Sequence, residues 1–176
     1  MSETVYIGLG SNLGDRERNL TAALEALGRI DAVAVTRCSS LYDSAPFGPP
    51  QPRYLNAVVQ LECGLPPQRL LGILKQIEID IGRTRGPRWS ARPIDLDMLI
   101  WDGRVIADPN LQVPHLELHR RRFALEPLCE LAPDVRHPVM RVAMRDLLSR
   151  LGPQDVVRHP STQWPEERSL EEGSAG

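Results

Sequence analysis

Residues 54–63, with the sequence YLNAVVQLEC, restrict the fold of this chain more than any other segment. Every second residue is apolar. Because successive side chains of a β-strand point to opposite faces, this alternation predicts a strand with one face in the core. The inward-facing set is Leu55, Ala57, Val59, Leu61 and Cys63. Tyr54 and Asn56 then share the other face, where an amide offers donors and an acceptor to the edge of a heterocycle.

The segments around this strand predict the fold class. Further strands are expected at residues 4–10, 32–42 and 92–101, and helices at 15–29 and 66–81. The order strand, helix, strand, strand, helix, strand is typical of the split βαβ, or ferredoxin-like, arrangement. We therefore predict an α+β protein in which helices pack on a mainly antiparallel sheet around a ferredoxin-like βαββαβ core.

Additions to this core are expected toward the C-terminal side. Asp102-Gly103 predicts a two-residue hairpin between residues 98–101 and 104–107, and helices are expected at about 118–131 and 141–151. Residues 1–152 are expected to form a single catalytic domain. The segment 153–176 is polar, contains several prolines and has five acidic residues against two arginines, so we predict an acidic, poorly ordered tail.

Bulk properties narrow the class of protein. A chain of 176 residues fits one domain with a sizeable core, and its three cysteines, Cys38, Cys63 and Cys129, are too far apart to suggest a metal site. No secretory leader and no membrane-spanning run is apparent, so a cytoplasmic location without a membrane partner is expected. The net charge of −2 argues against a nucleic-acid partner, and no obligate protein partner is evident.

Asp95 and Asp97 are the first candidates for chemistry. In a strand they share one face, with Cα atoms about 6.6–7 Å apart, while Ile94, Leu96, Met98 and Ile100 take the other. Two carboxylates so close repel each other unless a proton, an arginine or a cation lies between them. The pair could be the exposed side of an edge strand, or it could bind two Mg²⁺ ions about 3.5–4 Å apart.

An arginine-rich segment lies directly before this pair. Arg83, Arg85, Arg88 and Arg92 occur with no acidic residue among them, and Trp89 lies in the same segment. One interpretation is a solvated basic loop. The other is a polyphosphate site, because guanidinium groups bind phosphate oxygens while the nearby carboxylates bind Mg²⁺. Trp89 is then either a core anchor or a cover over a bound ring.

Other motifs are weaker when taken singly. Residues 8–14 (GLGSNLG) resemble a dinucleotide-binding turn but have Leu13 where the third glycine is required, so a tight strand-to-helix turn is the simpler interpretation. No Walker A ending is present. His115, Phe123 and Tyr54 are each more often structural than functional residues.

Taken together, these residues resemble a known family. The stretches GSNLG (10–14), YLNA (54–57), Ile77-Glu78, Arg83 to Arg92, DLD (95–97) and VPH (113–115), with Arg121 and Phe123, are similar in kind and order to those of the 6-hydroxymethyl-7,8-dihydropterin pyrophosphokinases of folate biosynthesis. The similarity covers about residues 4–150. It implies pyrophosphoryl transfer from ATP to the hydroxymethyl oxygen of a reduced pterin, with release of AMP.

The resemblance also implies roles for individual residues. Asp95 and Asp97 would hold two Mg²⁺ ions against the ATP phosphates, and with Arg83 and Arg92 they form the implied catalytic set. The implied ATP contacts are Glu78, Arg85, Arg88, Trp89, His115 and Arg121. The implied pterin contacts are Ser44, Ala45, Phe47, Tyr54, Asn56 and Phe123, with Tyr54 and Phe123 on either side of the ring.

The chain departs from the family pattern at three places. Ser90-Ala91 stands where Gly-Pro is frequent, Leu116 follows the histidine where a polar aromatic is frequent, and the acidic segment after Gly152 has no counterpart. Two other functions use the same residue types. An RNA-binding module would place arginines on phosphates and aromatic rings on bases, and a Mg²⁺-dependent phosphohydrolase would cleave a nucleotide without a pterin.

Overall fold

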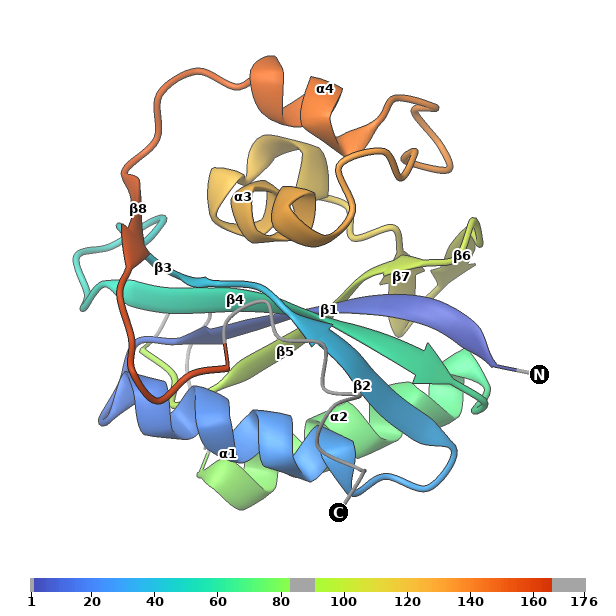
Figure 1. The fold of residues 1–176 in the computed structure, drawn as a ribbon, viewed down its shortest axis with the longest axis horizontal. Coiled ribbons are helices and arrows are strands. Elements are labelled where there is room, and N and C mark those ends of the chain that lie inside the picture. The colour runs from blue at the N-terminus through green and yellow to red at the C-terminus, as the bar shows by residue number, and fades with distance from the viewer. Residues whose placement is uncertain (1, 83–90, 166–176) are drawn as a thin grey trace.

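A computed structural model describes residues 2–82 and 91–165 of the chain. It has a six-stranded antiparallel sheet between two layers of helices (Figure 1). The sheet strands are β1 Glu3–Ser11, β2 Val33–Cys38, β3 Leu41–Ser44, β4 Tyr54–Cys63, β5 Asp95–Trp101 and β8 Val156–His159. Their order is β5-β1-β4-β3-β8. Strand β2 also pairs with β4, at residues 59–63, whereas β3 pairs with residues 54–56 of β4. The predicted α+β class and the order of the ferredoxin-like core are confirmed.

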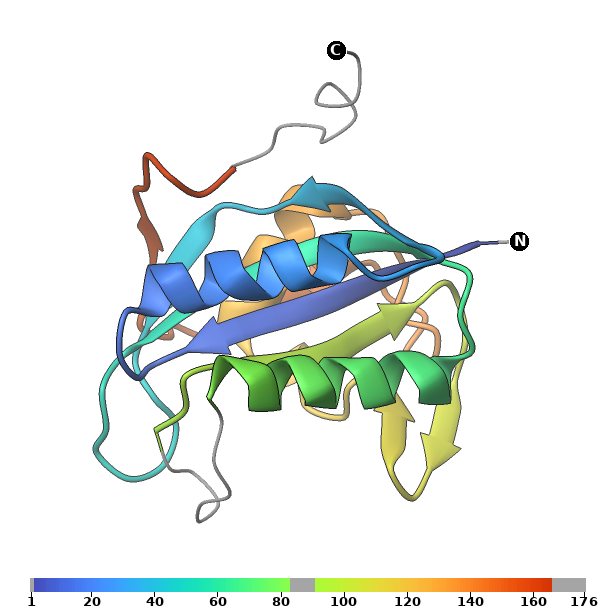
Figure 2. The same ribbon diagram turned by 90° about the horizontal axis from the view of Figure 1, so that it is seen from below.

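The inward face of the sheet packs on helices α1, Arg16–Gly28, and α2, Pro67–Ile81, which lie side by side across it (Figure 2). All five apolar residues predicted to face inward from β4 belong to this core and are at most 1% exposed. The helices contribute Leu20, Ala23, Leu27, Leu70, Leu74 and Ile77. The alternation in residues 54–63 therefore identified the buried face correctly.

The opposite face has a second core. It packs on helix α3, Arg122–Leu131, and helix α4, Met144–Ser149, and a short 3-10 turn, Leu118–Arg120, leads into α3. Val58 of β4 and Leu125, Leu128 and Met144 of the helices are fully buried there. These helices cover only part of the face (Figure 1). The uncovered part contains the cavity described below.

Strict alternation fails at the end of β5. Tyr6 pairs with Ile100 and Ile7 with Met98, which leaves Leu99 as an extra residue in a β-bulge. The bulge turns Ile100 into the second core and Trp101 into the first. The expectation that Ile100 shares a face with Leu96 was therefore wrong, whereas Asp95 and Asp97 precede the bulge and keep their common face.

The predicted hairpin after β5 is also wrong. Asp102 and Gly103 do form a turn, with φ values of 20° and 73°. However, β6, Ile106–Asp108, pairs with β7, Leu111–Val113, and not with β5. The backbone N–H of His115 donates to the carbonyl oxygen of Leu99 on β5 instead, at 3.0 Å. This bond brings His115 to the edge of the strand that carries the two aspartates.

Residues 153–165 correct the prediction of a poorly ordered tail for that part of the chain. Strand β8 pairs with β3, and beyond it Trp164 is only 3% exposed and donates from Nε1 to the carbonyl oxygen of Ser39 at 2.7 Å. We call residues 153–165 the strap, because they pass from the α3–α4 layer along the edge of β3 to α1 (Figure 1). The prediction treated 153–176 as one polar, acidic segment and so overlooked the apolar residues within the strap. Residues 166–176 lie outside the described residues.

The burial of Trp164 predicts that the strap stabilises the fold. Trp164→Ala should lower the free energy of unfolding by roughly 3–5 kcal/mol, because a large side chain leaves the core. Trp164→Phe should also lower the free energy of unfolding. About 1 kcal/mol of that loss should come from the hydrogen bond between Trp164 and Ser39, in addition to the loss from reduced packing. Chemical denaturation measures both, and an unfolding free energy unchanged in Trp164→Ala would contradict the packing described.

Candidate active site

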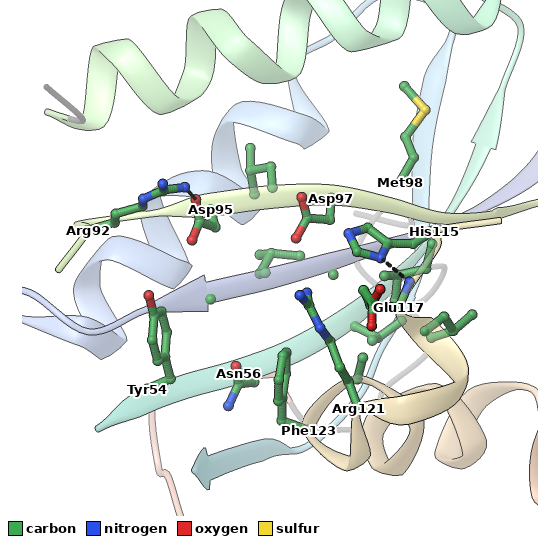
Figure 3. Close-up of a pocket in the computed structure, with 18 of the residues that line it drawn as sticks. Tyr54, Asn56, Arg92, Asp95, Asp97, Met98, His115, Glu117, Arg121 and Phe123 are labelled. Carbon is green, nitrogen blue, oxygen red and sulfur yellow. Dashed lines mark hydrogen bonds and ion pairs between the residues drawn. The ribbon is translucent and has the colours of Figure 1, made fainter. Parts of the chain in front are cut away.

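A cavity of about 660 Å³ opens on the sheet face that α3 and α4 leave uncovered (Figure 3). Residues from β1, β4, β5, α2 and the start of α3 line it. Among them are all twelve predicted site residues that the structure describes: Ser44, Ala45, Phe47, Tyr54, Asn56, Glu78, Arg92, Asp95, Asp97, His115, Arg121 and Phe123. The other four, Arg83, Arg85, Arg88 and Trp89, lie outside the described residues. The structure therefore brings together residues that are up to 79 positions apart, from Ser44 to Phe123.

The carboxylates lie along one side of the cavity. Asp95 and Asp97 project from the same face of β5 (Figure 3). Arg92 donates from Nη1 to Oδ1 of Asp95 at 3.1 Å. Burial works against the charged form of Arg92, but the Asp95 carboxylate more than offsets it, so the pKa of Arg92 lies above its ordinary value. An arginine is thus one of the partners that the sequence required for this pair.

Two glycines form the floor beside the carboxylates. Gly8 and Gly10 of β1 pair with Asp97 and Asp95 on one side and with Val58 and Asn56 on the other. A Cβ atom at Gly10 would lie 3.5 Å from Oδ1 of Asn56, within the cavity. Because β1 has no side chain at these two positions, the carboxylates of β5 and the amide of Asn56 on β4 face the same open space. Glycine inside a strand often marks such a close approach, which the interpretation of residues 8–14 as a turn missed.

Asn56 and the aromatic residues form one end of the cavity. Asn56 is 4% exposed, and its Nδ2 donates to the carbonyl oxygen of Tyr42 at 3.1 Å and to Oγ of Ser44 at 2.8 Å. With these donors engaged, its Oδ1 is the atom directed to Gly10 and the cavity. The rings of Phe47 and Phe123 lie 5.7 Å apart, and Tyr54 projects from β4 on the other side of Asn56 (Figure 3).

His115 lies beside Asp97, and Arg121 extends from the start of α3 toward the carboxylates (Figure 3). The Nδ1 atom of His115 accepts from the backbone N–H of Glu117 at 3.1 Å. Burial lowers the pKa of His115 and outweighs the opposing effect of Asp97, while Arg121 adds to the lowering. The guanidinium of Arg121 lies 5.6 Å from the centre of the Phe123 ring. Neutral His115, bonded at Nδ1, thus carries its proton on Nε2 and can donate from there.

Two residues at the candidate site were not predicted from the sequence. Lys75, the only lysine of the chain, lines the cavity from α2 one turn before the buried Glu78. Asn12 is 1% exposed and connects three segments: its Oδ1 accepts from the backbone N–H of Arg92 at 2.7 Å, and its Nδ2 donates to Gln51 and to the carbonyl oxygen of Pro52. Asn12 thereby fixes the backbone of Arg92 against the loop that precedes Tyr54. The available signals were its position after a glycine-rich strand end and its place in the stretch GSNLG, which contributes to the family resemblance.

Comparison with known proteins identifies the family. The sequence model described as 7,8-dihydro-6-hydroxymethylpterin-pyrophosphokinase matches residues 6–133. The chain belongs to this family. A 2-amino-4-hydroxy-6-hydroxymethyldihydropteridine pyrophosphokinase of Pseudomonas aeruginosa is 42% identical over 139 residues, which are 78% of this chain and 86% of that protein. A protein of the same description from Haemophilus influenzae is 42% identical over 156 residues, covering 88% and 97% of the two chains. Family membership makes this chain a pyrophosphokinase.

Solved structures agree on the fold. A Plasmodium falciparum HPPK-DHPS triple mutant matches with a TM-score of 0.70 at 15% identity. The match covers 85% of this chain and 44% of that one, so the present chain spans less than half of the Plasmodium protein. Within residues 2–82 and 91–165, none of the helices has the length and hydropathy needed to cross a bilayer.

The bare floor predicts a strong effect of adding a side chain at Gly10. Gly10→Val should leave the fold intact, because a Cβ there makes only ordinary contacts and valine suits a strand. It should lower pyrophosphokinase kcat/KM by on the order of 100-fold, equivalent to about 2.7 kcal/mol, since the added methyl groups fill the space beside Asn56.

Gly72→Ala is the matched control, because a Cβ at Gly72 on α2 has nothing within 4 Å. This variant should keep full activity. Steady-state kinetics together with thermal unfolding separate the two cases, and a Gly10→Val enzyme of normal kcat/KM would show that the floor need not be bare.

Proposed function

We propose that the chain catalyses the Mg²⁺-dependent transfer of pyrophosphate from ATP to 6-hydroxymethyl-7,8-dihydropterin, giving the pterin diphosphate and AMP for folate synthesis. One observation carries this proposal: a single cavity has a carboxylate pair with arginines at one side and an aromatic pocket with a buried amide at the other. The relatives that share 42% identity are described as pyrophosphokinases of this pterin alcohol.

The aromatic end suits a flat heterocycle. Tyr54 and Phe123 are assigned to the two faces of the pterin ring, and Phe47, Ala45 and Ser44 to its surroundings. Oδ1 of Asn56 would accept from an N–H of the ring, because its amide nitrogen is already bonded to Tyr42 and Ser44. A buried acceptor favours a ring that has a donor at the matching edge and disfavours analogues that lack it.

The residues at the carboxylate side fit magnesium that arrives with a nucleotide. Within the described ranges, no three His, Cys, Asp or Glu side chains are grouped so as to hold a metal ion. Mg²⁺ is commonly bound by one or two carboxylates while substrate phosphates and water complete its shell, and Asp95 and Asp97 supply the two carboxylates. Two Mg²⁺ ions are assigned to this pair. When bound, the metal neutralises phosphate charge and lowers the pKa of a coordinated hydroxyl.

The remaining polar residues are assigned to ATP. Arg92 and Arg121 bring positive charge to the cavity from opposite sides, where guanidinium groups stabilise phosphate oxygens as charge develops on them. His115 donates from Nε2 to a phosphate oxygen, since its Nδ1 is occupied by the N–H of Glu117. Glu78 on α2 is assigned to the adenosine side. Arg83, Arg85, Arg88 and Trp89, which lie outside the described residues, complete the ATP site predicted from the sequence.

Product analysis tests the reaction itself. The protein with ATP, Mg²⁺ and 6-hydroxymethyl-7,8-dihydropterin should release AMP in a one-to-one ratio with pterin diphosphate, and neither product should form without metal or without pterin. ADP as the product would contradict pyrophosphoryl transfer. Breakdown of ATP without pterin would favour a phosphohydrolase, and a salt-sensitive complex with single-stranded RNA in the absence of turnover would favour a binding module.

A second prediction tests the metal assignment. Asp97→Ala should lower kcat by on the order of 1,000-fold while the protein stays folded, because an exposed carboxylate is lost from the metal site and not from the core. Asp31→Ala, which removes an exposed carboxylate between α1 and β2, is the control and should keep full activity. Turnover near the wild-type rate in Asp97→Ala would remove Asp97 from the metal site.

A further inference from the structure

Helix α3 begins without a cap of its own. Its N-cap residue, Arg121, makes no side-chain capping hydrogen bond, yet the first N–H groups of a helix have no partner within the helix. Gln154 of the strap supplies one, because its Oε1 accepts from the backbone N–H of Arg122 at 3.0 Å. Its Nε2 donates to the carbonyl oxygen of Arg120 at 2.9 Å. One side chain thus holds the backbone on both sides of Arg121.

The next two residues of the strap hold a different wall of the cavity. The carbonyl oxygen of Asp155 accepts from the backbone N–H of Ala45 at 3.0 Å, and Val156 pairs with Ser44 in the sheet. The Asp155 carboxylate accepts two hydrogen bonds from Arg53, at 2.7 and 2.9 Å, directly before Tyr54. Arg53 also contacts Asp43. Asp155 and Val156 therefore bind the segment that carries Ser44, Ala45 and Tyr54.

These two walls face each other across the aromatic end of the cavity. Arg121 and Phe123 lie on the α3 side, and Ser44, Ala45 and Tyr54 on the β3–β4 side. The rings of Phe47 and Phe123 join the two walls, and near the other end of α3 Glu130 accepts hydrogen bonds from Ser40 and Tyr42. At the start of α3, residues 154–156 bond to both walls and so restrain the separation between them there.

We propose that residues 154–156 are a positioning clamp that sets the width of the heterocycle pocket, with Gln154 as its deciding residue. This proposal rests on the proposed function only in taking the pterin as the ring that enters the pocket. Gln154 itself does not line the cavity, so it acts through Arg121 and Phe123. The far end of the strap is anchored separately, by Ser161 at Glu17 of α1 and by the buried Trp164.

The separate anchoring provides a matched set of variants. Gln154→Leu keeps the approximate size and removes both hydrogen bonds, whereas Gln154→Glu keeps an oxygen that accepts from the Arg122 N–H. Ser161→Ala removes an anchoring hydroxyl at the other end of the strap, away from the cavity. KM for the pterin, KM for ATP and the melting temperature are measured for each in the full chain.

Gln154→Leu should raise KM for the pterin about fivefold to tenfold, because the wall that carries Phe123 loses its hold. KM for ATP should rise less, because Arg121 is only one of several residues assigned to ATP. Gln154→Glu should recover only part of this loss, because it keeps the bond to the Arg122 N–H but cannot donate to the carbonyl oxygen of Arg120. Ser161→Ala should lower the melting temperature without changing either KM. An unchanged KM for the pterin in Gln154→Leu, or equal rises of both KM values in all three variants, would overturn the clamp.

Hydrogen exchange separates this proposal from the proposed function. Gln154→Leu should speed exchange of the amides of residues 121–125 and leave those of α1 unaffected, whatever the reaction catalysed. Exchange at the wild-type rate would overturn the clamp even in an active enzyme. Failure of the wild-type protein to form AMP from ATP and pterin would overturn the proposed function alone.

Discussion

Burial of the apolar face of β1, β4 and β5 on α1 and α2 determines the position of the candidate site residues on β4 and β5. Fully burying one large aliphatic residue stabilises a fold by about 1.5–3 kcal/mol, and Leu55, Val59 and Leu61 are each at most 1% exposed. A register slip of one residue would exchange the two faces, so this burial excludes it. The same alternation then obliges Asn56, Asp95 and Asp97 to face the other side. The apolar face thus fixes the orientation of these three residues, although none of them belongs to it.

The second face serves two purposes in neighbouring areas. Where Val58 and Ile100 lie, α3 and α4 complete a core, and where Gly8 and Gly10 lie the sheet is left uncovered as the floor of a cavity. The boundary between the two areas is the start of α3, which contributes Arg121 and Phe123. The residues proposed to bind substrate therefore stand on elements backed by packed apolar side chains, and this limits how far they can move before a ligand arrives.

Local patterns predicted the parts of the fold that depend on local rules. Alternation identified β4 and its buried face, and the resemblance located twelve residues that line one cavity. The misses have non-local causes. The bulge at Leu99 depends on pairing with Tyr6 and Ile7, and at the edge of β5 the backbone of His115 bonds to Leu99 while β6 pairs with β7. The roles of Asn12 and Trp164 likewise depend on partners 80 and 125 positions away, which no sequence window includes.

The strap also affects the order in which the protein is assembled. Trp164 bonds to Ser39 and β8 pairs with β3, so contacts that complete one wall of the cavity join residues more than 110 positions apart. Contacts of such long sequence separation carry a large loop-closure entropy and tend to form late in folding. During synthesis the sheet core and both helical layers emerge before the segment that braces them. A nascent chain can thus bury most of its two cores well before the cavity reaches its final dimensions.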